Sequence, residues 1–190
     1  MSPRAGDRRD RPRAPTAAEA RAEVEARRAE VRAERERQFA EAYGDDVPGR
    51  WILAVSWVST LVFVVVAAAA ALQPGSASEP SIGLQGFVTL ALGYFALGCA
   101  VFAVDLVLIA ARSRESLMGI GGLFFLAGAA PRPVQWHLLG SFGVQVAVSL
   151  VAAAVRPFTP LAFGILAPTL GLAFCGLWAV RHGVFDPRRR

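Results

Sequence analysis

Long runs of apolar residues, broken by short polar segments, fill the chain between residues 51 and 180. The helices of a water-soluble domain would instead keep a polar face, because one side of each helix stays in solvent. Four of the runs are about 20 or more residues long, enough for a helix to cross a hydrocarbon core of about 30 Å. The pattern predicts an all-α membrane protein, a four-helix transmembrane bundle with spans at residues 51–72, 85–111, 135–155 and 158–180.

A fifth apolar run, residues 117–130, is too short to cross the membrane, because it would form only about 21 Å of helix. It also contains several glycines, which weaken a helix. We therefore expect this run to form an interfacial or re-entrant segment on the cytosolic side of the membrane.

The polar region before the first span divides into two parts. Residues 1–15 are rich in Arg, Pro and Asp, cannot bury enough apolar surface to fold, and are expected to be disordered. Residues 16–46 are expected to form a charged cytosolic helix. Thr16 and Glu19 match a capping box, and the residues that follow, up to about Tyr43, are mostly Ala, Glu and Arg, which are strong helix formers.

This charged helix allows two interpretations. Ala17, Val24 and Val31 recur every seven residues, as in one seam of a coiled coil, but Arg27 and Glu34 fall in the second seam. The pattern favours a solvated helix over a paired one. The alternative is an arm, residues 16–43, that docks a cytosolic protein partner or a second copy of the chain.

The arginine distribution predicts the orientation. All 20 basic residues are arginine, and in the four-span arrangement only Arg156 lies on the side opposite to the two termini. Because basic segments stay in the cytosol, both termini are expected there, the basic tail 182–190 included. We expect a plasma-membrane protein whose arginines meet anionic lipid headgroups. This placement accounts for the sequence pI of about 10.5, so we expect no nucleic-acid partner.

Asp105 is the only ionisable residue predicted to lie within the hydrocarbon. A carboxyl group at that depth should face protein or water and find a partner. The simplest interpretation is an ion pair that holds the second span in place. The alternative is a proton or cation site near the cytosolic end of the bundle, with His137 and Arg132 as candidate neighbours at similar depth.

Each predicted span also carries small polar groups near the middle of the membrane. These residues are Ser59, Thr60, Cys99, Gln145 and Thr169. Gln145 is the costliest to bury, because its amide needs several hydrogen-bond partners. Hydrogen bonding between helices is the simpler interpretation, and a site for a small uncharged solute is the alternative.

The last predicted span is expected to pack closely against its neighbours. It carries small residues at three- and four-residue steps, at Gly164, Ala167, Gly171 and Cys175. Such a stripe lets another helix approach closely. Pro168 lies within the stripe and is expected to kink the span.

The sequence contains no motif of a membrane hydrolase, metalloprotease or thiol oxidoreductase, and its histidines and cysteines lack metal-ligand spacing. We therefore expect no enzymatic activity, no metal and no cofactor. The stretches RPFTPLAFG at residues 156–164 and GLWAVRHG at residues 176–183 resemble uncharacterised small integral membrane proteins of actinobacteria. The resemblance covers the last two spans and implies no particular activity.

Two functional hypotheses follow from these patterns. The first is a membrane scaffold or interaction protein that docks partners through its cytosolic helix. The second is a small transporter or channel subunit that uses Asp105 and the mid-membrane polar residues. The absence of an ionisable residue at the midplane weakens the second hypothesis, because ion-coupled transport sites usually lie there.

Overall fold

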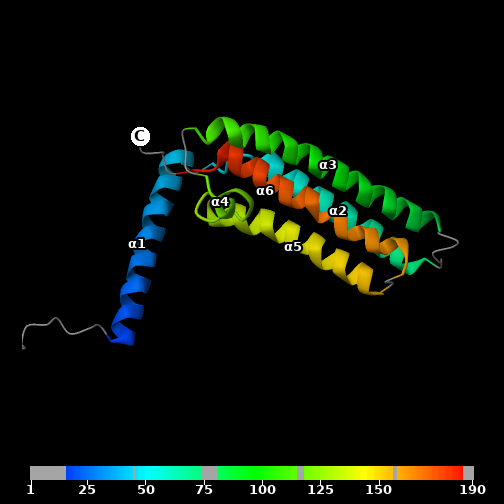
Figure 1. Cartoon of the computed structure of the whole chain (residues 1–190), viewed down its shortest axis with the longest axis horizontal. Coiled ribbons are helices and arrows are strands. Elements are labelled where there is room, and N and C mark those ends of the chain that lie inside the picture. The colour runs from blue at the N-terminus through cyan, green and yellow to red at the C-terminus, as the bar shows by residue number, and fades with distance from the viewer. Residues whose placement is uncertain (1–15, 45, 74–80, 115–117, 156–157, 186–190) are drawn as a thin grey trace, which may run out of the picture. The chain divides into compact units, whose positions relative to one another are not determined.

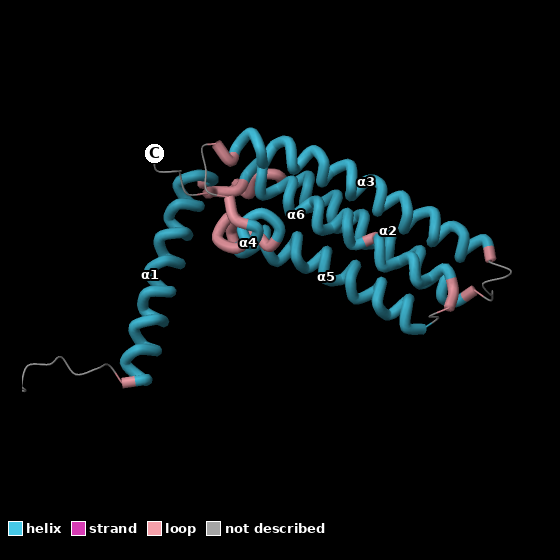
Figure 2. The backbone as a smooth tube through the Cα atoms, viewed as in Figure 1, coloured by secondary structure: helices cyan, strands magenta, loops and turns pink. Residues whose placement is uncertain are grey.

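The computed structural model describes residues 16–44, 46–73, 81–114, 118–155 and 158–185. The segment expected to be disordered, the end of the basic tail and Arg156 lie outside these residues. Within them the chain forms helices and no strand (Figure 2), in the order α1, α2, α3, α4, α5, η1 and α6. The chain divides into two compact units, one ending at Gln38 and the other beginning at Phe39.

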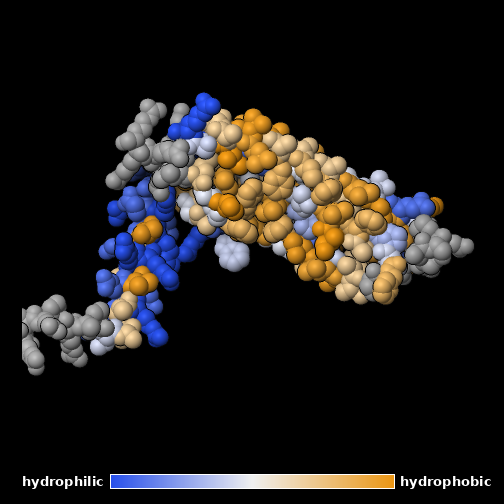
Figure 3. Space-filling model, viewed as in Figure 1, coloured by the Kyte–Doolittle hydropathy of each residue, from blue (hydrophilic) through white to orange (hydrophobic). Residues whose placement is uncertain are grey.

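Helix α1 (Ala17–Tyr43) begins with the predicted capping box. The backbone N–H of Thr16 donates to the Glu19 carboxylate at 2.6 Å, and the backbone N–H of Glu19 donates to the Thr16 hydroxyl at 3.3 Å. The bond from the Thr16 backbone N–H, and to a lesser extent the Thr16 hydroxyl beside the carboxylate, hold the pKa of Glu19 below its ordinary value. No residue of α1 is buried, and hydrophilic side chains cover most of it in Figure 3.

Four helical segments of the second unit are long and apolar enough to cross a membrane (Figure 1). They are α2 (Arg50–Leu72), α3 (Ile82–Arg112), α5 (Arg132–Val155) and the segment Pro160–His182. Large apolar side chains such as Val58, Leu61 and Val65 are more than half exposed on α2. Such an apolar surface is unfavourable in water and is typical of a helix that faces lipid. The prediction of an all-α, multi-pass membrane bundle is confirmed.

The fourth segment differs from the continuous, kinked helix predicted around Pro168. A 3₁₀ helix, η1 (Pro160–Leu166), comes first, and α6 (Pro168–His182) follows. Each element has proline in its first turn, where the missing N–H is not needed and the fixed φ suits a helix. Pro168 therefore starts a new helix instead of bending an existing one.

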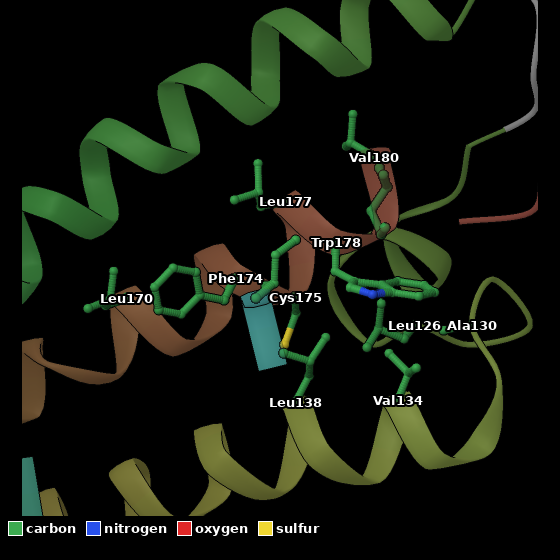
Figure 4. Close-up of a cluster of buried hydrophobic side chains, with 13 residues drawn as sticks. Leu126, Ala130, Val134, Leu138, Leu170, Phe174, Cys175, Leu177, Trp178 and Val180 are labelled. Atoms are coloured by element: carbon green, nitrogen blue, oxygen red, sulfur yellow. The ribbon is translucent and has the colours of Figure 1, made fainter. Parts of the chain in front are cut away.

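Helix α6 is the centre of the bundle. It packs against α2, α3, α4 and α5, and most of its residues are buried. Figure 4 shows the apolar cluster around it, in which Trp178 lies next to Leu126 and Val134. A second cluster, further along the spans, is built around Phe63 and Phe87, whose ring centroids are 5.7 Å apart. α6 thus has an apolar sequence because it is surrounded by protein, whereas α2, α3 and α5 also face lipid.

The described part of the predicted interfacial segment contains one short helix, α4 (Ile120–Phe124), followed by turns. Gly128 has a φ of +69°, a conformation that glycine adopts without cost. Leu126 has a φ of +57°, which is unfavourable for a branched side chain. Its side chain is fully buried in the cluster around α6, and this packing holds the strained backbone in place.

Candidate functional site

Asp105 is buried in α3 where that helix meets α6. It has no exposed surface, and neither of its carboxyl oxygens has a hydrogen-bond partner among the described residues. On α6, Gly176 lies opposite, and a Cβ atom at Gly176 would come within 2.7 Å of Oδ2 of Asp105 and 3.1 Å of the Phe124 ring. The missing side chain of Gly176 is what leaves room for the carboxyl group.

The ion pair predicted for Asp105 is not formed by the described residues. Arg181 is near enough to attract the carboxyl group electrostatically but makes no hydrogen bond with it. Arg112, two turns further along α3, instead donates to the carbonyl oxygens of Val180 and Gly183. A buried carboxyl group without a partner inside a membrane bundle is costly to keep, and it marks a candidate functional residue.

The other two candidates near Asp105, His137 and Arg132, are exposed residues of α5. The ring of His137 meets the ring of Trp57 edge-on, with centroids 6.5 Å apart. Arg132 lies in the first turn of α5 and lines a surface groove with Trp136. Neither residue bonds to Asp105, so the structure does not join the three into one site.

A seam of buried polar side chains joins α2 to α5. Its members are Ser56, Thr60, Ser141, Gln145 and Ser149. The hydroxyl groups of Ser56 and Ser141 bond to each other, and the side-chain N–H of Gln145 donates to Thr60 Oγ1 at 2.8 Å. The Ser149 hydroxyl lies 2.7 Å from the backbone carbonyl oxygen of Gln145 and 2.8 Å from the backbone carbonyl oxygen of Gly164 in η1.

One side-chain atom of this seam, Oε1 of Gln145, has no partner among the described residues. It faces α6 at Gly171, where a Cβ atom would come within 2.8 Å of it. The other side-chain groups of the seam bond to one another or to helix carbonyls. The arrangement therefore suits the joining of helices better than the binding of a solute.

The remaining residues of the predicted mid-membrane set lie apart from the seam. Cys99 is exposed on α3, and Thr169 is half-buried at the start of α6. The Ser59 hydroxyl donates to the Ser56 carbonyl on its own helix at 2.9 Å. Of the predicted set, Thr60 and Gln145 are the pair that the structure joins by a side-chain hydrogen bond.

Three members of the seam were not singled out from the sequence: Ser56, Ser141 and Ser149. Their signal is spacing, because Ser56 precedes Thr60 by four residues and Gln145 stands four residues from each of the other two serines. Residues four apart lie on the same face of a helix. This four-residue period of polar groups in two apolar runs would have predicted the seam.

A second group of contacts, also absent from the sequence prediction, satisfies the carbonyl groups at the end of α6. Arg112 donates to the carbonyls of Val180 and Gly183, and the Tyr43 hydroxyl donates to the carbonyl of His182. The last carbonyls of a helix have no partner within it, so these bonds replace the missing ones. Burial raises the pKa of Tyr43, and the charge of Arg112 opposes this to a lesser extent, so the phenol keeps its proton at neutral pH.

The small residues predicted for helix packing are all buried. They are Gly164, Ala167, Gly171 and Cys175. They do not serve a single neighbour. A Cβ atom at Gly164 would come within 2.7 Å of the Phe87 ring on α3, whereas Gly171 lies against Gln145 of α5. The stripe therefore seats η1 against α3 and α6 against α5.

No protein-family model matches this chain, and comparison with curated proteins and with solved structures finds no match either. The resemblance of the last two spans to small actinobacterial membrane proteins stays a prediction. Function is therefore inferred from the chain's own geometry.

Proposed function

We propose that this chain is a membrane-embedded interaction protein that docks an acidic protein partner through α1. The observation that carries the proposal is that α1 is a capped helix of 27 residues, none of which is buried. Most helices in proteins are held by the packing of one face, because a helix alone is only marginally stable in water. Helix α1 has no such packed face of its own, so a partner can supply one.

One face of α1 combines arginines with the helix's two valines. Arg21, Arg28 and Arg35 are seven residues apart and so lie on one side of a helix, which turns about 100° per residue. Val24 and Val31 lie on the same side and are 49% and 57% exposed. Residues Glu23 and Glu30, also seven apart, fall on a different side.

This face has the chemistry of a docking surface. Val24 and Val31 line a shallow surface groove together with Arg27, Arg28 and Arg32. An apolar pair framed by guanidinium groups is complementary to a partner helix or loop that carries acidic residues around an apolar side chain. We therefore favour an acidic protein over a second copy of the chain, which would also bring its own arginines to the contact.

In this proposal α1 and both termini lie in the cytosol and the bundle lies in the plasma membrane. The positive-inside rule supports this orientation, because nearly all arginines of the chain flank the spans on one side. The even number of spans, four, keeps the two termini together.

The proposal is tested with a matched pair of charge reversals, Arg28→Glu and Arg37→Glu. The two positions are nine residues apart, which places them on opposite sides of the helix. Tagged full-length variants are extracted in mild detergent, cross-linked, and compared by quantitative mass spectrometry. We expect Arg28→Glu to lose an acidic partner that the unmodified chain and Arg37→Glu retain.

Equal recovery of every partner by both variants would overturn the proposal. Far-ultraviolet circular dichroism is the folding control, since both variants should keep the same helical content. Light scattering of the purified complexes gives the molar mass. A change of oligomeric mass in Arg28→Glu without loss of another protein would identify a second copy as the occupant and contradict the acidic partner.

Asp105 favours a second candidate function, proton or small-cation transport. Its carboxyl group is buried without a hydrogen-bond partner among the described residues, and a bound proton or cation would compensate it. The polar seam gives this candidate little support, because all of its side-chain groups except Oε1 of Gln145 are already hydrogen-bonded. Ion flux into liposomes containing the unmodified chain should exceed that with Asp105→Asn, and identical leak-level flux would count against transport.

A further inference from the structure

A groove of about 550 Å³ runs along the first turns of α5, lined by Arg132, Gln135, Trp136, Leu139 and Gly140. Counted from Arg132, the others stand three, four, seven and eight positions further on, so all five share one face of the helix. The groove belongs to a membrane-crossing helix, and Trp136 is 78% exposed beside it. Its walls are therefore in contact with the membrane environment and are not buried in the bundle.

The groove is polar at one end and apolar at the other. Arg132, at the polar end, makes no hydrogen bond or ion pair with another described residue and is exposed. It stands at the start of α5, where unpaired backbone N–H groups and the helix dipole add further attraction for an anion. At the apolar end, Gly140 has no side chain to fill the space, and the ring of Trp57 on α2 lies 3.9 Å from where a Cβ would be.

Gln135 holds the groove in a fixed shape. Its side-chain N–H groups donate to the carbonyls of Leu126 and Ala130, both at 2.8 Å. These bonds tie the first turns of α5 to the segment that follows α4. A ligand would therefore meet a preformed surface and would not have to order it.

The dimensions match the passage from a lipid headgroup to its acyl chains. From Arg132 to Gly140 the helix rises about 12 Å, whereas each polar interface of a bilayer is about 5–8 Å thick. A guanidinium at the polar end is suited to a phosphate, with which it forms paired, charge-assisted hydrogen bonds. The indole and leucine beyond it are suited to an acyl chain.

We propose that this groove binds one anionic phospholipid, with the phosphate at Arg132 and an acyl chain along Trp136 and Leu139. The occupant is a membrane lipid because the groove opens on the outer face of a spanning helix. It is anionic because the charges at its polar end are positive.

The test uses the purified full-length protein and native mass spectrometry with phosphatidylglycerol or phosphatidylcholine added. We expect phosphatidylglycerol to bind about tenfold more tightly than phosphatidylcholine, which carries the same phosphate but also a choline cation that offsets the attraction to Arg132. Arg132→Gln should abolish this preference. Arg114→Gln, which removes an exposed arginine outside the groove, is the matched control and should keep it.

A second readout does not depend on the arginine. Gly140→Leu fills the apolar end and should weaken phosphatidylglycerol binding with Arg132 intact. Brominated phosphatidylglycerol should quench the fluorescence of the unmodified chain more than that of Trp136→Phe. An equal effect of Arg132→Gln and Arg114→Gln, an unchanged affinity in Gly140→Leu, or displacement of the lipid by inorganic phosphate would each overturn the proposal.

Discussion

Gly98 sets the distance between α3 and α6. A Cβ atom at this buried position would lie 2.9 Å from the backbone N of Leu170 and from the carbonyl carbon of Thr169. Backbone atoms at the start of a helix cannot move aside as the end of a flexible side chain can. A side chain at position 98 would therefore push α3 away from the start of α6.

Gly98→Ala should lower the free energy of unfolding by roughly 1–3 kcal/mol, because the added methyl group overpacks this contact. Unfolding by sodium dodecyl sulfate in mixed micelles, followed by fluorescence, measures the change. Gly93→Ala is the control, since a Cβ there meets nothing within 4 Å. It should leave stability unchanged or raise it by up to about 1 kcal/mol. Equal destabilisation by the two variants would contradict this assignment.

Glu19 should make the start of α1 sensitive to acid. Its pKa in the folded helix is lowered from 4.5, mainly by the bond from the Thr16 backbone N–H. For a carboxyl group with a lowered folded pKa, the stabilisation is present above the unfolded pKa and is lost as pH falls through the folded one. The first turn of α1 should therefore fray below about pH 4.5 and not in the neutral range.

Nuclear magnetic resonance titration of the Glu19 carboxyl carbon in the full-length protein measures this directly. We expect its inflection below pH 4.5. Thr16→Ala removes the hydroxyl acceptor and weakens the box, so the inflection should move upward. An inflection in the unmodified chain at or above the ordinary value would show that the capping box is not formed in solution.

At the scale of elements, two hydrogen bonds between side chains join α2 to α5, one between Ser56 and Ser141 and one from Gln145 to Thr60. The bond from Gln145 to Thr60 can be tested by itself. A double-mutant cycle with Gln145→Met and Thr60→Val isolates this bond from the loss of each residue alone. We expect a coupling of about 0.6–1.7 kcal/mol, the range of hydrogen bonds between membrane helices. A coupling near zero would show that the seam contributes by shape and not by this bond.

The elements themselves could be predicted because each signal is local. Apolar runs give the spans, and Thr16 with Glu19 gives the start of α1. Which helix is central could not be predicted, because an apolar run looks the same whether lipid or protein surrounds it. Pro168 was equally ambiguous, since proline suits both a kink and a first turn, and only the 3₁₀ geometry of η1 decides between them.

The candidate site could be predicted only in part, because some of its features are local in the sequence and others depend on how the helices pack. Asp105 stood out because a charge in an apolar run is rare, but the lack of a partner depends on where Arg112 and Arg181 point. Arg112 satisfies the carbonyl groups at the end of α6, a contact between residues far apart in the chain. The groove on α5 likewise depends on the missing side chain of Gly140 and on the neighbouring ring of Trp57.

At the scale of the whole molecule, four spans require the two termini to lie on one side of the membrane. In our proposal this side is the cytosol, because nearly all arginines of the chain flank the spans there. In a bacterial host, green fluorescent protein fused after residue 190 or before residue 1 should fluoresce. Alkaline phosphatase fused after Gln73 should be active, because that position follows one span. Fluorescence from only one of the two terminal fusions would exclude the four-span arrangement.

The central helix α6 comes after α2, α3 and α5 in the chain, so it is synthesised after the helices that pack around it. While the ribosome is still making η1 and α6, the earlier helices sit in the bilayer without the element that separates them from lipid. During that interval the carboxyl group of Asp105 and the amide oxygen of Gln145, which face α6 in the finished bundle, have no protein covering them. A chain stopped before Pro160 would keep them uncovered permanently, and a membrane protease that recognises polar groups within the bilayer would have a means of telling it from the completed protein.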